Sequence, residues 1–348
     1  MQPHEYYMQR CFELARLGAG SVSPNPMVGA VLVYQDRIIG EGWHQRYGQA
    51  HAEVNAVNNV KTEDRAFISQ STLYVSLEPC NIYGKTPPCT NLILQNKIPR
   101  VIISCLDQTP EVAGKGVEIL RANGVEVITG ILEDKGKEIS RFRNHFVTHE
   151  RPYIILKFAQ TRNGLFGKAN EQVWISNEYS KRLVHKWRSE VDAILVGTNT
   201  AQVDNPALTN RLYFGKSPLR IVIDKHLKLP DNLHLFEPEH PTLVITSEVN
   251  PPPATSAVTY VSVPDDANFL SAFLKILHSR KIAILLVEGG AKLLEQLLQN
   301  NLWDEARVLI GDEILTEGIA APLIFGELTA RHQLDSDQII CYRNVHRR

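Results

Sequence analysis

Short apolar runs alternate with segments of helical spacing along most of the chain, and this alternation restricts the fold more than any other feature. Residues 4–17 have apolar side chains at helical spacing, and apolar runs at residues 28–34 and 37–39 follow them. Gln35-Asp36 between the two runs predicts a tight hairpin turn. One hairpin followed by strand–helix repeats predicts a mixed sheet with helices on both faces.

The strand–helix repeats continue toward the C-terminus. In the first half we predict helices that begin near residues 51 and 89 or span about 116–123, and strands at 73–77, 101–104 and 125–128. In the second half we predict helices around 179–188, 268–279 and 291–298, and strands at 153–158, 193–196, 220–223, 243–246, 282–287, 306–310 and 338–342. Both halves are therefore predicted to be α/β units.

The length of 348 residues favours two domains, because a single hydrophobic core seldom keeps growing to that size. Residues 140–151 are basic and only weakly apolar, and Pro152 then opens a new strand. We place the domain boundary near residue 147, which gives domains of residues 1–147 and 148–348.

The composition is that of a soluble globular protein, with 43% apolar and 22% charged residues and no apolar run long enough to span a membrane. The first residues lack the basic end and apolar stretch of a secretory signal, so we expect a cytoplasmic protein. Five cysteines, an odd number, argue against a disulfide framework and favour metal ligation or burial. The formal net charge of −1 provides no overall field that would attract nucleic acid.

Three residues have the types and the order of a catalytic zinc site. His51 opens a predicted helix, Cys80 follows a predicted strand, and Cys89 opens the next helix. One imidazole and two thiolates neutralise the ion and leave the fourth tetrahedral position to water. Each fragment taken singly is weak evidence, since a lone His-x-Glu is more often a helix-capping feature. The three together, in this order, predict a zinc site.

Glu53 is the predicted proton carrier of that site. Zinc lowers the pKa of a bound water to roughly 7, and the resulting nucleophile can attack a ring carbon that carries an amino group. A second group must then take up the water's proton and protonate the departing nitrogen. Residues two apart on a helix point about 200° from each other, so His51 and Glu53 are not expected to be adjacent ligands.

Motifs in the first half resemble those of the bifunctional riboflavin-biosynthesis deaminase/reductase family. They are Ser23-Pro-Asn-Pro-Met-Val-Gly29, Gly42-Trp-His44, His51-Ala-Glu53, Leu77-Glu-Pro-Cys80, Gly84-Lys-Thr-Pro-Pro-Cys89 and Val112-Ala-Gly-Lys-Gly116. Nucleic-acid and cytidine deaminases usually have only two residues between their cysteines, whereas this chain has the segment from Asn81 to Pro88. The resemblance implies a cytidine-deaminase-like N-terminal domain and assigns substrate contacts to Asn25 and Lys85.

The resemblance continues through the second half. Its motifs are Leu156-Lys-Phe-Ala159, Trp174-Ile-Ser176, His185-Lys-Trp-Arg188, Asp192-Ala-Ile-Leu-Val-Gly197, Asp204-Asn-Pro-Ala-Leu208-Thr, Arg220-Ile-Val-Ile-Asp224 and Val287-Glu-Gly-Gly290. In the family this half is a dihydrofolate-reductase-like domain that reduces a ribosyl group to ribityl with NADPH. The similarity implies cofactor contacts from Ala159, Trp174, Thr200, Asp204, Gly289 and Gly290. It implies contacts with the phosphorylated substrate from Arg188, Leu208, Arg211 and Glu288.

The segment around Gly289-Gly290 supports part of this assignment on physical grounds. An apolar strand runs into Glu288-Gly289-Gly290 and then a helix, so a helix N-terminus could receive a diphosphate. A plain tight turn is nearly as good an interpretation of this fragment, and no Gly-x-Gly-x-x-Gly indicates a Rossmann domain. Arg188 has a comparable alternative, because an arginine at a helix end is usually solvated. Lys225 and Lys228 are candidate cations for a 2′-phosphate.

Three departures from the family pattern stand out. Ile82 replaces a common histidine after the first zinc cysteine, which removes one polar contact near the deaminase substrate. Asn163 stands in a turn where an aspartate is usual, so the turn is retained and the carboxylate is lost. Beyond Gly311 the family's ending is hard to follow, and no residue is assigned there.

We therefore expect a homo-oligomeric enzyme that acts on a small pyrimidine phosphate and uses zinc and NADPH. The N-terminal domain would remove an amino group from a diamino-hydroxy-phosphoribosylamino-pyrimidine, and the C-terminal domain would reduce the ribosyl group. Two alternatives remain at this stage. The C-terminal half could be an inactive scaffold, as Asn163 hints, or the protein could edit or bind nucleic acid through its basic residues 141–151.

Overall fold

A computed structural model describes residues 3–168 and 171–345. Contacts divide the chain into two compact units, Met1–Glu150 and Arg151–Arg348. Every helix in the described ranges is too short or too polar to cross a lipid bilayer.

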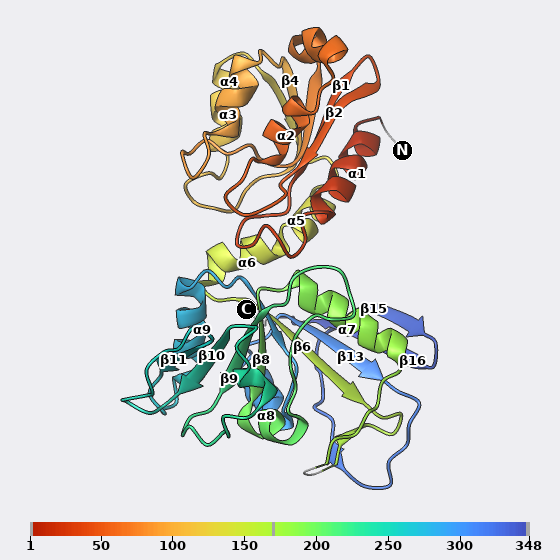
Figure 1. The fold of residues 1–348 in the computed structure, drawn as a ribbon. Coiled ribbons are helices and arrows are strands. Elements are labelled where there is room, and N and C mark those ends of the chain that lie inside the picture. The colour runs from red at the N-terminus through yellow and green to blue at the C-terminus, as the bar shows by residue number, and fades with distance from the viewer. Residues whose placement is uncertain (1–2, 169–170, 346–348) are drawn as a thin grey trace. The chain divides into compact units, whose positions relative to one another are not determined.

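The first unit alternates helices and strands after an N-terminal helix and a hairpin (Figure 1). Its elements are α1 (Pro3–Arg16), β1 (Gly29–Tyr34), β2 (Arg37–Trp43), α2 (Ala52–Asn58), the 3₁₀ helix η1 (Thr62–Gln70), β3 (Thr72–Leu77), α3 (Cys89–Gln95), β4 (Arg100–Cys105), α4 (Lys115–Ala122), β5 (Glu126–Thr129), α5 (Glu133–Ile139) and α6 (Arg141–His149).

The sheet of this unit has the strand order β2-β1-β3-β4-β5. Strand β1 is antiparallel to both β2 and β3, whereas β3, β4 and β5 are parallel, so the predicted mixed sheet is confirmed. Gln35 and Asp36 both have positive φ, 46° and 62°, as a type I′ hairpin turn requires.

Helices cover both faces of this sheet because its central strands are apolar on both sides. On one face Met8 and Phe12 of α1 pack in a buried cluster with Val31 of β1. On the other face Ala56 of α2 belongs to a second cluster with Leu32. Figure 1 shows α1 and α5 on one side of the sheet and α2, α3 and α4 on the other.

Glycine in β2 allows α2 to lie close to the sheet. A Cβ atom at Gly42 would overlap the backbone nitrogen of Ala56, so a larger residue would push α2 outward. Because α2 begins directly after His51, this close contact fixes the height of His51 and Glu53 above the carboxyl edge of the sheet.

The second unit is built around a larger, mostly parallel sheet. Its elements are β6 (Tyr153–Gln160), β7 (Leu165–Gly167), α7 (Glu178–Glu190), β8 (Ala193–Gly197), α8 (Thr198–Asp204), β9 (Leu219–Ile223), the 3₁₀ helix η2 (His234–Phe236), β10 (Thr242–Thr246), β11 (Val258–Ser262), α9 (Phe269–Ser279), β12 (Ile284–Val287), α10 (Ala291–Gln299), β13 (Glu305–Ile310), β14 (Ile319–Ala320), β15 (Glu327–Leu334) and β16 (Asp337–Arg343).

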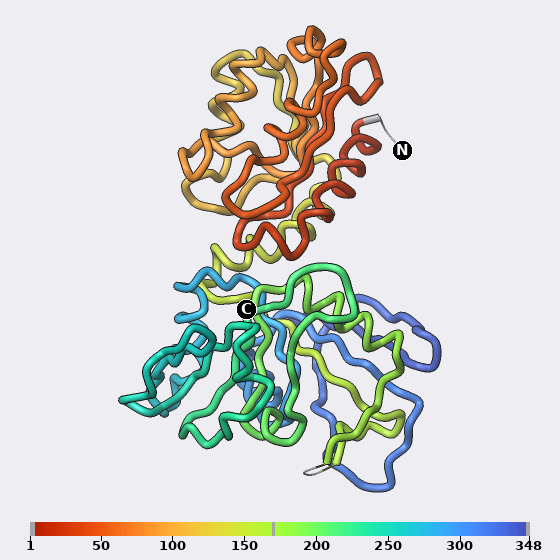
Figure 2. The backbone as a smooth tube through the Cα atoms, viewed as in Figure 1, coloured from red at the N-terminus to blue at the C-terminus, as the bar shows by residue number. Residues whose placement is uncertain are grey.

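The strand order is β11-β10-β9-β8-β12-β6-β13-β16-β15, with β16 antiparallel to β13 and β15 antiparallel to β16. The first strand of the unit, β6, therefore lies between two strands formed much later. Figure 2 shows this green segment beside blue ones. Apolar residues of α9 and α10, among them Phe273 and Leu294, pack in one buried cluster with Leu156 and Leu285 of the central strands.

Several elements have no clear apolar periodicity and were not predicted. The basic stretch near the predicted boundary is helix α6, which buries Asn144, His145 and Phe146 although most of its residues are polar. The contact division falls between residues 150 and 151, a little beyond the predicted position. Helix α8 buries only Ala201, and the edge strand β15 exposes most of its side chains. Without a continuous apolar stripe, such elements give no sequence signal.

Candidate active sites

The predicted zinc residues lie at three neighbouring element ends in the first unit. His51 is the N-cap residue of α2 and has extended backbone, Cys80 lies beyond the end of β3, and Cys89 is the first residue of α3. The Sγ atom of Cys80 accepts a hydrogen bond from the backbone N–H of Cys89 at 3.4 Å, which ties the two cysteine segments together.

The donor atoms of these three residues suit a zinc ion. His51 Nδ1 lies 3.5 Å from Cys80 Sγ and 3.4 Å from Cys89 Sγ, and all three donor atoms lie within 4.8 Å of one another. Tetrahedral zinc with its usual bond lengths places such atoms roughly 3.3–3.8 Å apart. One imidazole and two thiols therefore fit three corners of a zinc tetrahedron. Among the described residues, Cys11, Cys105 and Cys341 do not join this group.

The pKa values of the two thiols are shifted in opposite directions. Hydrogen bonds from the Cys89 thiol and from His51 lower the pKa of Cys80, while the same contact with Cys80, together with burial, raises the pKa of Cys89. One thiolate is thus favoured even before a cation adds its charge, and thiolates are the form that binds zinc.

Glu53 lies beside this group on the first turn of α2. Its side chain is only 3% exposed, and burial raises the pKa of its carboxyl group. It is not a member of the three-residue metal group among the described residues. A buried carboxyl group that holds its proton more strongly than usual suits a proton carrier.

His44 also belongs to this site, although the sequence analysis assigned it no role. Its ring contacts that of His51 edge to face at 5.3 Å. Because Nδ1 donates to the carbonyl of Ala50 at 3.0 Å, Nε2 is the acceptor for the Asn25 amide at 3.2 Å. Burial lowers the pKa of His44, which keeps the ring neutral. The Gly42-Trp-His44 motif could have identified His44 from the sequence. In the structure His44 connects Asn25 to the proposed zinc ligand His51.

Glu78, also unassigned from sequence, organises the loop beside Cys80. Its carboxylate is buried and accepts backbone N–H groups of Asp107 at 3.3 Å and Gly114 at 2.9 Å. Gly116 at 2.9 Å and Val117 at 3.3 Å donate to its other oxygen. Four donors hold the loop after β4 and the start of α4 against the segment that carries Cys80.

The segment between the two cysteines carries the remaining predicted deaminase residues on its surface. Lys85 is exposed, and its Nζ lies 4.3 Å from the ring centroid of Tyr47. Ile82, which replaces a polar residue of the family, is 44% exposed.

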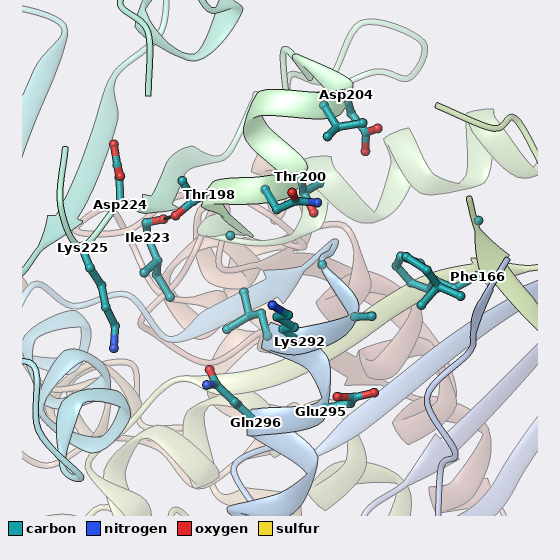
Figure 3. Close-up of a pocket in the computed structure, with 18 of the residues that line it drawn as sticks. Phe166, Thr198, Thr200, Asp204, Ile223, Asp224, Lys225, Lys292, Glu295 and Gln296 are labelled. Atoms are coloured by element: carbon teal, nitrogen blue, oxygen red, sulfur yellow. Dashed lines mark hydrogen bonds between the residues drawn. The ribbon is translucent and has the colours of Figure 1, made fainter. Parts of the chain in front are cut away.

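In the second unit, a pocket of about 880 Å³ lies between α8, α10 and the end of β9 (Figure 3). Of the predicted cofactor residues, Thr200, Asp204 and Gly290 line it. Ala159, Trp174 and Gly289 are not among the described residues of its wall. Trp174 is 64% exposed and lies under the ammonium group of Lys181.

The two glycines before α10 have backbone conformations that favour glycine. Gly289 has φ of 155° and Gly290 has φ of 77°. A Cβ atom at Gly290 would lie 3.1 Å from Thr200 Oγ1. The junction between β12 and α10 is therefore a tight turn, and it also places the backbone of Gly290 in the pocket wall.

Two predicted substrate residues bind each other in the second unit. Arg188 donates from Nε and Nη2 to the carboxylate of Glu288 at 2.7 and 2.9 Å, and from Nη1 to the carbonyl of Thr209 at 3.0 Å. Lys157 Nζ lies 3.6 Å from the same carboxylate. Arg188 is thus held in a buried ion pair and is not a solvated helix end.

Charge explains how Glu288 stays ionised in this buried place. Burial alone would raise its pKa, but the cations of Arg188 and Lys157 lower it to about 2. Burial also lowers the pKa of Lys157. Lys157 lies in the Leu156–Ala159 motif but was not among the predicted site residues. A buried lysine beside a carboxylate is a further functional candidate that the sequence did not single out.

The other predicted substrate residues lie on the loop after α8. Leu208 is buried with φ of 54°, whereas Arg211 is exposed and its backbone N–H donates to His185 Nδ1 at 3.0 Å. Burial lowers the pKa of His185 to about 4, so its ring stays neutral and keeps this acceptor. His185 therefore fixes the backbone position of Arg211.

Asn163 has a structural role that an aspartate would not reproduce. Its amide donates to the carbonyl of Leu315 at 2.7 Å and accepts the hydroxyl of Thr161 at 2.8 Å. A carboxylate could not donate to Leu315. Asparagine at this position lacks the family's carboxylate but provides a hydrogen bond that joins two loops.

Two protein families match this chain in succession. Residues 1–105 match the cytidine and deoxycytidylate deaminase zinc-binding region, and residues 152–341 match the RibD C-terminal domain. The riboflavin biosynthesis protein RibD of Aquifex aeolicus is 38% identical over 318 residues, which covers 90% of this chain and 88% of that protein. The chain belongs to the RibD family. RibD of Bacillus amyloliquefaciens is 36% identical and covers 93% of this chain and 88% of its own length.

Solved RibD structures have the same fold. A diaminohydroxyphosphoribosylaminopyrimidine deaminase/5-amino-6-(5-phosphoribosylamino)uracil reductase of Thermotoga maritima matches with a TM-score of 0.89 and 32% identity, and covers 98% of this chain and 99% of its own. RibD of Acinetobacter baumannii matches with a TM-score of 0.87 and 30% identity over the same shares. The predicted fold class, the two enzyme activities and the use of zinc and NADPH are confirmed for this RibD-family chain. Neither the inactive-scaffold nor the nucleic-acid alternative gains support from these relatives.

Proposed function

We propose that this chain hydrolyses the amino group from 2,5-diamino-6-hydroxy-4-(5-phosphoribosylamino)pyrimidine and then reduces the ribosyl group to ribityl with NADPH. The observation that carries the proposal is the group of one imidazole and two thiols within 4.8 Å of one another beside the buried Glu53. Further support comes from the name of the Thermotoga maritima relative, which describes this pair of reactions.

In the deaminase site, His51, Cys80 and Cys89 are the proposed zinc ligands. When bound, zinc activates a water molecule for attack on the ring carbon that carries the amino group. Glu53 takes up a proton from that water and delivers one to the departing nitrogen, which leaves as ammonia. Asn25, held by the neutral His44, would orient the pyrimidine through its free amide groups.

In the reductase site, NADPH is proposed to bind in the pocket beside Thr200, Asp204 and Gly290. When bound, it supplies the reducing equivalents for the ribosyl carbon. Lys225, His226 and Lys228 line the same pocket. The positive charge of Lys225 and Lys228 would favour a cofactor with a 2′-phosphate, and therefore NADPH over NADH.

The substrate of the reduction is proposed to lie over the ion pair of Arg188 and Glu288. Most Arg188 hydrogen bonds are already made within the protein, so the exposed Arg211 is the better candidate for the phosphate. Leu208 would provide an apolar contact, and Ala159, Trp174 and Gly289 remain proposed cofactor contacts outside the described pocket wall.

Replacing Arg211 with alanine tests the reductase assignment. We expect the KM for the deaminated pyrimidine to rise about 10- to 100-fold, because a charged hydrogen bond to phosphate contributes ~1.5–3 kcal/mol. Asp204→Ala should raise the KM for NADPH, because Asp204 lines the cofactor pocket. Ammonia release from the diamino substrate is the control and should not change. Equal loss of both activities in either variant would instead indicate unfolding.

We also propose three further properties of the chain. The two activities would divide near residue 147, a cytoplasmic location would keep the zinc-binding thiols reduced, and the chain would form a homo-oligomer. In the described residues, β15 pairs only with β16, so one edge of the large sheet is open to a second chain. Sedimentation of the purified protein measures its oligomeric state.

A further inference from the structure

Arg143 on helix α6 is a cation with few hydrogen-bond partners among the described residues. Its Nη2 donates to the hydroxyl of Thr109 at 3.2 Å, and its Nε is buried without a hydrogen-bond partner. In the part of the chain that the structure describes, none of the ion pairs includes Arg143. A partly buried guanidinium group therefore retains N–H donors and positive charge for another ligand.

Thr109 places this guanidinium at the edge of the sheet that carries the zinc residues. Strands β3 and β4 are parallel neighbours, with Leu77 opposite Cys105, so both chains leave the sheet at the same edge. The first continues to Cys80, and the second continues to Thr109. Glu78 fastens the two segments together through its hydrogen bonds to the loop after β4.

The surroundings of Arg143 contain both signs of charge. Burial lowers its pKa, and nearby Asp107, Glu111 and Tyr47 oppose that shift. The carboxylate of Asp107 is turned to the backbone N–H of Thr109, from which it accepts a hydrogen bond at 2.7 Å. Tyr47 also lies under the ammonium group of Lys85. Tyr47 thus lies close to Lys85 and near enough to Arg143 to interact with its charge.

We propose that Arg143 binds the phosphate of the pyrimidine substrate in the deaminase site and makes this site selective for the phosphorylated compound. The inference rests on the proposed function, which requires that a phosphoribosyl group extend from the ring that is deaminated. Nε is buried, so the end of the guanidinium group that carries Nη1 and Nη2 is the part that matches two phosphate oxygens, and the hydrogen bond from Nη2 to Thr109 holds that end in place.

The experiment compares two substrates in zinc-loaded, full-length protein. One is the phosphoribosylamino-pyrimidine, and the other is the same compound without its phosphate. We expect Arg143→Ala to lower kcat/KM for ammonia release from the phosphorylated substrate about 10- to 100-fold and to leave the unphosphorylated substrate unaffected. Arg143→Lys keeps the positive charge but loses the paired N–H donors of the guanidinium group, so it should recover part of the selectivity.

Arg100→Ala is the matched control. Arg100 opens β4 at the opposite end of the strand and pairs with Glu126 at 2.7 Å, so its loss removes the same charge far from Thr109. It should leave the ratio of the two kcat/KM values unchanged. Zinc content and thermal unfolding of each variant verify that the domain is folded.

Two results would overturn the proposal while the proposed function stands. Equal losses with both substrates in Arg143→Ala would assign the residue a structural role, and no loss with either would exclude it from the site. A wild-type protein that releases ammonia from neither compound would contradict the proposed function and the inference with it.

Discussion

Replacing Glu53 with glutamine should abolish deamination and leave the zinc in place. The amide has nearly the same shape as the buried carboxyl group, and the proposed ligands His51, Cys80 and Cys89 are untouched. An amide cannot exchange a proton with the attacking water or the departing nitrogen, so the rate should fall by about 10²- to 10⁴-fold. Ammonia release measures the rate, and elemental analysis measures the zinc.

The same variant has an internal control, because the second activity can be tested alone. Glu53→Gln should still oxidise NADPH when it is given the already deaminated pyrimidine. Loss of zinc from the variant would show that Glu53 is a ligand or a structural residue. Failure to reduce the deaminated compound would show that the two halves depend on each other in a way that neither unit suggests by itself.

Replacing either proposed thiol ligand should reduce deamination by a similar factor, in this case through loss of bound zinc. Cys80→Ser and Cys89→Ser should each lower zinc occupancy from about one ion per chain and eliminate deamination, because a hydroxyl is a poor substitute for a thiolate. Chelation of the wild-type protein should do the same, and added zinc should restore activity.

Cys341→Ser is the matched control for the thiol variants. Cys341 is half-buried in the second unit and does not join the metal group of the described residues. It should keep both zinc and deamination. Full activity after complete chelation, or unchanged zinc in both ligand variants, would contradict the proposed site.

The grouping of the proposed zinc ligands could be predicted from sequence because each lies at the end of a recognisable element. A helix start after His51, a strand end before Cys80 and a helix start at Cys89 bring their donors to one edge of the sheet. The order of these residues in the sequence and their types are then enough to predict the metal-binding group. The proposed role of Glu53 followed from the same helix geometry.

Contacts between distant residues could not be predicted in this way. Arg188 and Glu288 are a hundred positions apart, and nothing in either local sequence shows that one is the buried partner of the other. A solvated Arg188 was therefore an equally acceptable interpretation of the sequence. Lys157 and Glu78 were missed for the same reason, since their roles come from neighbours supplied by other strands and loops.

Elements made mostly of polar residues also could not be predicted from the sequence. Helix α6 has the composition of an exposed basic segment, yet it buries three residues and positions Arg143. The sequence suggested a boundary and a nucleic-acid contact there. Burial of polar side chains depends on the partners that the fold supplies, which composition does not report.

One measurement tests the central claim, that this chain performs a deamination followed by a reduction. Purified zinc-loaded protein is incubated with the diamino-phosphoribosylamino-pyrimidine, with and without NADPH, while ammonia release and NADPH absorbance are followed together. We expect ammonia in both cases, and NADPH oxidation that begins after ammonia appears and reaches an equal amount. Ammonia without any NADPH oxidation, or NADPH oxidation without ammonia, would contradict the account.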